Sequence, residues 1–132
     1  MRKYRPSELA VKLDEAADLL ENSGWCRHVL KNPAGHHCLA GAVYEVTGAR
    51  WSMLDDGEYD LDTTNKGLQL MEAVEWAAET DPSVKGRYPV GWNDEQRDKR
   101  KVVRFMRRTA RRLRDGKLRR KPGNPWDQWV AV

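Results

Sequence analysis

The chain has 132 residues, of which 33% are charged and 39% hydrophobic, and its mean hydropathy is −0.85. This length favours one domain with one core, and no apolar run approaches the roughly 18 to 20 residues that a membrane span needs. An amphipathic stretch with Asp14 and Glu15 stands where a secretory signal would have its apolar region. We therefore expect a soluble, cytoplasmic protein whose two cysteines are reduced.

The net charge of +4 conceals a strong polarity along the chain. Residues 1–95 contain ten Lys or Arg and seventeen Asp or Glu, whereas residues 96–132 contain fourteen and three. Such asymmetry indicates a basic face or tail that meets nucleic acid, an acidic protein surface, or the acidic part of the same chain.

Apolar residues at three- and four-residue spacing predict a first amphipathic helix. Leu9, Leu13 and Leu20 share its core face, with Ser7 as the N-cap and Gly24 as the stop. The stretch 25–37 contains Asn-Pro-Ala-Gly at 32–35, which is a turn composition, so we expect a loop or a short hairpin there.

A short, buried helix of small residues is predicted from Cys38 to Gly48. Gly41 inside it costs about 1 kcal/mol relative to Ala, a cost usually accepted where another backbone approaches closely. Residues 49–62 lack a clean period and are rich in acids, so we expect a loop.

Two further helices complete the prediction. The third begins at Thr63 or Thr64 and ends near Asp81, with a core face of Leu68, Met71, Val74 and Ala78. The fourth begins at Asn93, which forms a capping-box pattern with Gln96, and ends near Asp115. Its core face contains Val102, Phe105 or Met106, Ala110 and Leu113.

These elements predict a mainly α fold, a single-domain bundle of about four helices with long connectors and a Trp-bearing C-terminal tail. The helical domain covers 1–116, and a basic tail containing Pro and Trp covers 117–132. Trp126 and Trp129 are three residues apart and are expected to fold back onto the bundle as one helical turn.

A stripe of arginines in the last helix is the strongest physical signal for function. Most of its members fall on one face of a 3.6-residue helix, and a guanidinium offers a planar fork of donors that suits phosphate. The predicted contact residues for nucleic acid or a protein partner are Arg100, Arg104, Arg107, Arg108, Arg111, Arg114, Trp126 and Trp129.

An intramolecular interpretation competes with that prediction. The stripe could be a solvated helix face that pairs with the acidic first three quarters of the same chain, which include Asp55, Asp56, Glu58, Asp60 and Asp62. The tryptophans likewise could stack on bases or anchor a partner, or could serve as core and anchoring residues.

Cysteine and histidine residues suggest two chemical alternatives. Cys38 stands where a helix begins, which lowers a thiol pKa, and it could act as a nucleophile with His37 and Asp94. A zinc ion could instead be held by Cys26, His28, His36 and Cys38. The spacing of these ligands is poor for zinc, and a buried Cys with exposed loop histidines explains the same residues.

The sequence contains three short motifs: Gly24-Trp25, the segment Cys-Leu-Ala-Gly-Ala at 38–42, and Trp92-Asn93-Asp94. They resemble a family of small proteins from actinobacteria and their phages, over about residues 9–113. The resemblance implies a domain and a source rather than an activity. It singles out Trp25, Cys38, Gly41, Trp92, Asn93 and Asp94, which small-residue helix packing explains without chemistry.

The sequence therefore predicts a small non-enzymatic binding protein whose basic C-terminal helix contacts nucleic acid or an acidic protein. If it is phage-encoded, an accessory protein that binds a host component is expected, in the host cytoplasm. We expect no cofactor and no membrane partner. The alternative is a Cys-dependent enzyme that uses Cys38, a neighbouring His and Asp94.

Overall fold

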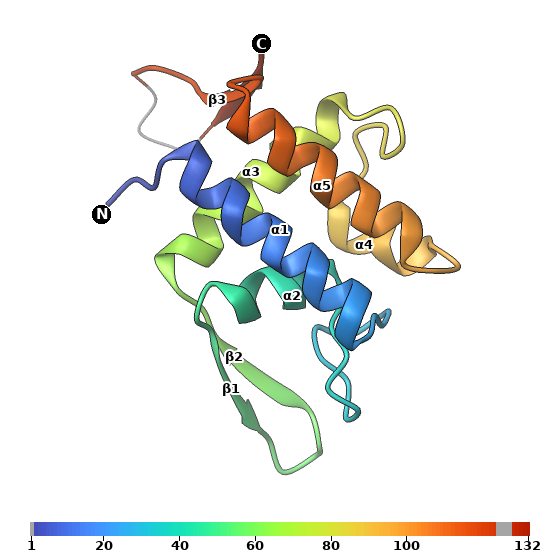
Figure 1. Ribbon diagram of the computed structural model, residues 1–132. Helices are drawn as coiled ribbons and strands as arrows, with labels where there is room; N and C mark the ends of the chain where they lie inside the picture. The colour runs from blue at the N-terminus through green and yellow to red at the C-terminus, as the bar shows by residue number, and fades with distance from the viewer. Residues whose placement is uncertain (1, 124–127) are drawn as a thin grey trace.

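The computed structural model describes residues 2–123 and 128–132. In that part of the chain five helices and two pairs of short strands are formed (Figure 1). The helices are α1 (Pro6–Ser23), α2 (Leu39–Val46), α3 (Asn65–Thr80), α4 (Pro89–Glu95) and α5 (Arg100–Arg114). The strands are β1 (Arg50–Met53), β2 (Tyr59–Asp62), β3 (Leu118–Arg120) and β4 (Trp129–Ala131). The prediction of a mainly α chain is confirmed, but a bundle of about four helices is not what forms.

The core lies where α1 meets α5 on one side and α2 on the other (Figure 1). Leu9, Leu13 and Leu20 of α1 are fully buried, as their spacing predicts. The predicted core face of α5 is also confirmed, since Phe105 and Met106 are both buried. Burial of a side chain of this size contributes roughly 1.5 to 3 kcal/mol, so these apolar faces hold the two helices together.

The first helix begins one residue earlier than Ser7. Pro6 occupies the first turn, where its missing N–H is no loss, and the Glu8 carboxylate accepts a hydrogen bond from the Arg5 N–H at 3.0 Å. Ser7 is therefore inside the helix rather than its N-cap. Gly24 ends the helix as predicted, with a positive φ of 120°.

The third helix begins as predicted, because the Thr64 hydroxyl accepts a hydrogen bond from Gly67 N–H at 3.2 Å. Its core face differs from the prediction at Leu68, which is 47% exposed. Gln69 is buried instead: its side chain accepts from Tyr4 N–H and donates to the Arg2 carbonyl. The N-terminal segment thus covers a face of α3 that the apolar spacing alone does not mark.

The predicted long helix from Asn93 is divided in two. Asn93 lies inside the short α4, and α5 begins only at Arg100, where Asp98 Oδ1 accepts a hydrogen bond from the Arg100 N–H at 2.9 Å. The Asn93 side chain does not cap a helix of its own, because it bonds to distant parts of the chain. The capping-box interpretation of Asn93 and Gln96 is therefore wrong.

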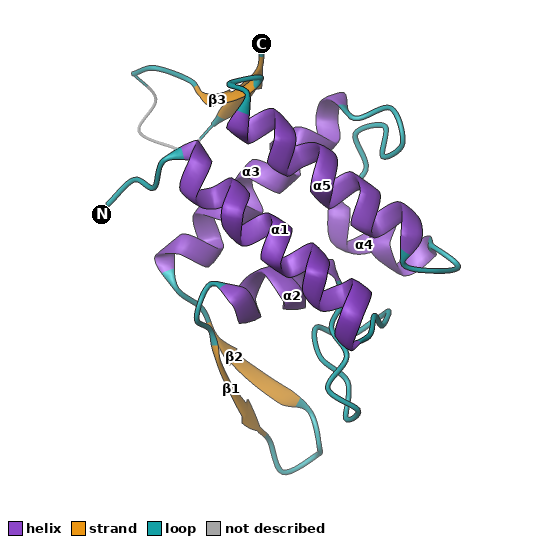
Figure 2. Cartoon of the chain, in the orientation of Figure 1, coloured by secondary structure: helices purple, strands orange, loops and turns teal. Residues whose placement is uncertain are grey.

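Residues 50–62, expected as a loop, form an antiparallel hairpin. Trp51 pairs with Leu61 in the register of β1 and β2, and Gly57 turns the chain with a φ of 87°. The hairpin extends away from the helices (Figure 2). Its root is attached through Trp51, whose indole N–H donates to the Glu45 carboxylate.

The segment after Gly116 forms the antiparallel pair β3 and β4. Leu118 and Trp129 are both buried and belong to the main core. Trp129 therefore lies in a strand, not in a helical turn, and it is a core residue rather than an exposed contact. Trp126 lies outside the described residues. The division at 116 into a domain and a tail stays a prediction.

A close backbone contact explains Gly41, as the sequence predicts. A Cβ added at Gly41 would lie 1.8 Å from the Leu30 carbonyl oxygen, because the 25–37 loop runs directly over α2. The same carbonyl accepts a hydrogen bond from Cys38 N–H at 3.2 Å. The loop and the start of α2 are thus held in one position.

We expect Gly41→Ala to lower the free energy of unfolding by about 1 to 3 kcal/mol, the usual cost of overpacking. Urea unfolding followed by circular dichroism measures it. Gly91→Ala in α4 is the matched control, since nothing lies within 4 Å of a Cβ there, and it should leave stability unchanged or raise it by up to about 1 kcal/mol. Equal effects of both changes would contradict the close contact.

Candidate functional site

The three sequence motifs meet at the side chain of Asn93, which is completely buried. Its Oδ1 accepts hydrogen bonds from the Trp25 indole N–H at 2.8 Å and from the Leu39 N–H at 3.2 Å. Its amide nitrogen donates to the Cys26 carbonyl at 3.3 Å and to Asp94 Oδ1 at 3.2 Å. Two donors and two acceptor positions are all used. The amide is therefore a structural tie between α4, the loop and α2.

Asp94 extends this tie on the surface side. Its Oδ1 also accepts a hydrogen bond from the His28 N–H at 2.8 Å, at a residue whose φ is positive. Trp92 packs edge-on against Phe105, with ring centroids 5.4 Å apart. The motif Trp-Asn-Asp thus connects the loop to the core of the protein through three successive side chains.

Cys38 has an environment that opposes a thiolate. The residue is 2% exposed and is the N-cap of α2, where its Sγ accepts a hydrogen bond from Gly41 N–H at 3.4 Å. Burial raises the pKa of its thiol to about 11. Burial also lowers the pKa of His37, which lies 3.7 Å from the Glu45 carboxylate. A nucleophilic Cys needs the opposite shift of its thiol pKa, so the geometry does not favour the enzyme alternative.

The zinc alternative is corrected by the geometry. Among residues 2–123 and 128–132, no group of three His, Cys, Asp or Glu side chains is placed to hold a metal ion. Cys26 Sγ lies 3.4 Å from a loop carbonyl oxygen, Cys38 caps α2, His28 is exposed, and the His36 ring packs over Gly24. These four proposed ligands are used separately, because the loop folds on α2 and α4 rather than around a common centre.

We expect Cys38 to react with iodoacetamide at pH 8 at least about tenfold more slowly than the half-buried Cys26, because its thiol is less accessible and more weakly acidic. Peptide mass spectrometry of the folded protein over a time course measures both rates. Denaturation should make the two rates equal. Faster alkylation of Cys38 in the folded state would restore the nucleophile interpretation.

One side of the arginine stripe is neutralised by α1. Arg107 donates hydrogen bonds to Asp18 at 2.6 Å and to Glu21 at 2.8 Å, and it lies 3.6 Å from Asp14. Arg114 donates to the other oxygen of Asp14 at 2.7 Å. The two helices run antiparallel, so acids spaced along α1 meet arginines in reverse order along α5.

A second side of the stripe binds the end of α3 and the turn after it. Arg108 donates to both oxygens of Asp81, each at 3.1 Å, and to the Ser83 hydroxyl at 2.7 Å. Arg112 donates to the Thr80 hydroxyl at 2.6 Å. Although burial raises the pKa of Asp81, the hydrogen bonds from Arg108 and Ser83 outweigh it and hold that pKa below its usual value.

Four further cations of α5 and of the segment 96–99 before it have no ion-pair partner within the described part of the chain. They are exposed and make no hydrogen bond or ion pair with any other residue that the structure describes; we name these four the open cations: Arg97, Lys101, Arg104 and Arg111. Arg100 is bound only to its neighbour Asp98, through two hydrogen bonds of 3.0 and 3.3 Å.

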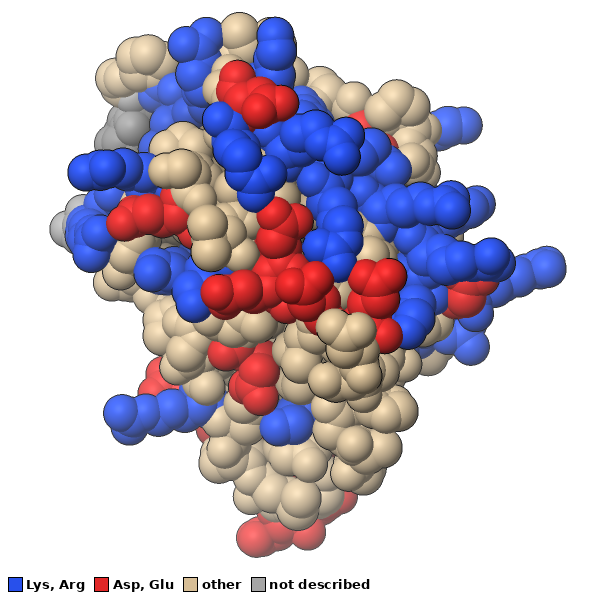
Figure 3. All heavy atoms as spheres, in the orientation of Figure 1, with Lys and Arg blue, Asp and Glu red and all other residues tan. Residues whose placement is uncertain are grey.

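Basic side chains crowd over α5, with the acids of α1 beside them (Figure 3). The acidic segment at 55–62 does not take part in this arrangement. None of its carboxylates forms an ion pair with α5 in the described part of the chain. The hairpin that carries them extends away from the helices (Figure 2). Asp55, Asp56, Glu58, Asp60 and Asp62 therefore do not cover the stripe. The intramolecular pairing forms with other acids of the preceding chain, on α1 and at Asp81.

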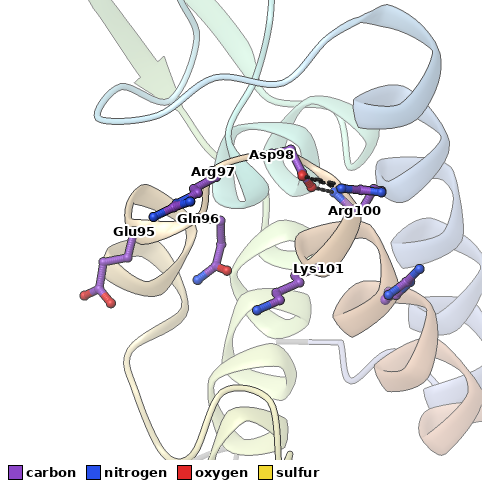
Figure 4. A pocket seen from close by; sticks show the side chains of 7 residues that line it. Glu95, Gln96, Arg97, Asp98, Arg100 and Lys101 are labelled. Atoms are coloured by element: carbon purple, nitrogen blue, oxygen red, sulfur yellow. Dashed lines mark hydrogen bonds and ion pairs between the residues drawn. The ribbon is translucent and has the colours of Figure 1, made fainter.

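A hollow of about 460 Å³ lies where α4 gives way to α5 (Figure 4). A second hollow of about 560 Å³ adjoins it, reaching to the turn after α3. The side chains that line both are Glu95, Gln96, Lys101 and Arg104. Sequence reasoning found the arginines here but missed the hollow, because it forms only where the helix is interrupted at 96–99.

The fold is mainly α. The candidate site combines an exposed cationic face of α5 with the buried, fully hydrogen-bonded side chain of Asn93. A family of unknown function, DUF6197, matches residues 5–112, and the chain belongs to this family. Comparison with curated proteins and with solved structures finds no match. In the part of the chain that the structure describes, no helix is both long and apolar enough to cross a membrane.

The ion pair between Asp81 and Arg108 predicts that the stability of the fold depends on pH. Because the pKa of Asp81 is lower in the folded than in the unfolded chain, its ion pair stabilises the fold above the unfolded pKa and is lost as the pH falls through the folded pKa. We expect Asp81→Asn to cost about 1 to 2 kcal/mol at pH 7 and distinctly less at pH 3.

Urea unfolding at several pH values between 7 and 3 measures this difference. Asp62→Asn, on the exposed hairpin, is the control for removal of one carboxylate. A cost of Asp81→Asn that stays constant down to pH 3 would show that the charge of Asp81 does not contribute.

Proposed function

We propose that this chain is a small non-enzymatic binding protein that contacts nucleic acid through the open side of α5. The observation that carries the proposal is the division of the arginine stripe. Arg107 and Arg114 are bound by α1, and Arg108 is bound at the end of α3. Only Lys101, Arg104 and Arg111 of α5 remain exposed, without any such partner among the described residues.

Like charges three and four residues apart weaken a helix. The three open cations of α5 share one face of the helix with Arg108, which brings Lys101, Arg104 and Arg111 close to one another. An external polyanion would relieve that repulsion. The buried apolar face of α5 keeps the row in place whether or not a partner is present.

Nucleic acid fits this row better than an acidic protein surface does. A duplex carries one charge per about 1.7 Å of its axis. Lys101 and Arg111 are ten positions apart, so the row extends over roughly 15 Å at the α-helical rise. Guanidinium groups bind phosphate oxygens in pairs. Trp92 and Trp129 are buried, so we propose contact with the phosphate backbone rather than with stacked bases.

The resemblance of the motifs also suggests a source and a cellular location for the chain. We propose that the chain comes from an actinobacterium or one of its phages and has an accessory role in the cytoplasm of such a cell. An acidic host protein is the alternative partner, and the experiment below separates the two.

We expect a fluorescein-labelled 20-base-pair duplex of arbitrary sequence to bind with an affinity that falls steeply between 50 and 200 mM NaCl. The triple variant Lys101→Gln, Arg104→Gln, Arg111→Gln should weaken binding at least about tenfold at 100 mM NaCl. It should also reduce the slope of log affinity against log salt by about three, roughly one for each lost phosphate contact. Fluorescence anisotropy measures both quantities.

A matched triple variant removes the same charge elsewhere: Lys12→Gln, Arg50→Gln, Lys66→Gln. It should change the affinity less than threefold, because these residues lie on α1, the hairpin and α3. An equal loss in both triples, or an affinity insensitive to salt, contradicts the proposal. Binding of poly-glutamate without binding of the duplex would identify an acidic protein as the partner.

A further inference from the structure

The hollows at the junction of α4 and α5 concentrate cationic side chains around a small volume (Figure 4). Each hollow has the size of a small-molecule site, which usually measures about 300 to 1,000 Å³. Seven Lys or Arg side chains line the two hollows, against two carboxylates: Lys85, Arg87, Arg97, Arg100, Lys101, Arg104 and Arg108, with Glu95 and Asp98.

Each of the two carboxylates is already paired with one of the arginines that line the hollows. Asp98 binds the Arg100 guanidinium through two hydrogen bonds and also accepts the Arg100 main-chain N–H. Glu95 forms an ion pair with Arg87. Neither carboxylate is therefore left to pair with the other cations that line the hollows.

The cations that remain surround the same space. Lys101 and Arg104 line both hollows and lie three residues apart on one face of α5. Arg97 enters from the segment between the helices. Lys101 extends from α5 toward Gln96 across the hollow (Figure 4). Three exposed cations from two elements thus line the smaller hollow without an ion pair to any described residue.

The larger hollow has an apolar floor. Trp92 and Val84 line it while being 4% and 0% exposed, respectively. Low-polarity walls strengthen the attraction between a cation and an anion above them, because the effective dielectric constant is lower there than in water. The floor leaves no exposed aromatic face on which a base could stack, so the hollow favours the phosphate part of a ligand.

We infer that the smaller hollow, of about 460 Å³, is a phosphate-binding site, in which Arg97, Lys101 and Arg104 hold two or more phosphate groups. The inference rests on the proposed function in one respect, since it places the strongest backbone contact of α5 here rather than at Arg111. The phosphate groups belong either to a nucleic-acid backbone or to a free polyphosphate. Guanidinium forks bind phosphate oxygens in pairs, and the Lys101 ammonium adds a point charge.

Isothermal titration calorimetry of the full chain with sodium tripolyphosphate at 50 mM NaCl tests the site. The variant Lys101→Gln, Arg104→Gln should raise the Kd at least about tenfold. The matched variant Lys117→Gln, Arg119→Gln removes two exposed charges outside both hollows and should raise the Kd less than twofold. Equal increases in the two variants, or no saturable binding to the unaltered chain, would overturn the site.

Competition with the labelled duplex distinguishes the sources of phosphate. Displacement of the duplex by tripolyphosphate supports a backbone contact in the hollow. Binding of tripolyphosphate to a chain that does not bind the duplex supports a site for free polyphosphate and overturns the proposed function alone. Duplex binding without tripolyphosphate binding overturns the phosphate site alone.

Discussion

The buried amide of Asn93 is the constraint on which the site depends. A polar group without access to water must make its hydrogen bonds within the protein, and leaving one unmade costs about 1 to 3 kcal/mol. Asn93 makes all of its bonds to the loop before α2, to α2 itself and to Asp94. This requirement fixes the end of α4. The chain must then turn before α5 can start on the apolar surface of α1, and that turn creates the cationic hollow.

Apolar packing and ion pairs have different roles in α5. Exposed ion pairs contribute about 0 to 1 kcal/mol each, whereas a fully buried side chain such as Phe105 contributes roughly 1.5 to 3 kcal/mol. Packing therefore decides where the helix lies. The ion pairs of Arg107, Arg108 and Arg114 decide which of its cations are left exposed. The face available to a partner is thus defined by the acids of α1 and by Asp81, not by the arginines alone.

The sequence predicts the parts of the fold that repeat with a helical period. The apolar faces of α1 and α5, the start of α2 at Cys38 and the close approach at Gly41 all follow from local patterns. The strands do not, because three or four residues are too few to show alternation. The break between α4 and α5 is also hidden, since Asn93 bonds to residues more than fifty positions away. Sequence identifies the arginines of the site but not which of them α1 neutralises.

The charge of the hairpin β1–β2 affects how the molecule is oriented as it approaches a charged partner. Its exposed acids stand apart from α5, near the lower edge of the view in which the basic helix occupies the upper right (Figure 3). Opposite charges separated in this way form an electric dipole. In the field of a polyanion the dipole turns the helix forward and the hairpin back, over distances of about a Debye length, roughly 10 Å at 0.1 M salt. Under the proposed function, the hairpin would therefore orient a collision in which it makes no contact.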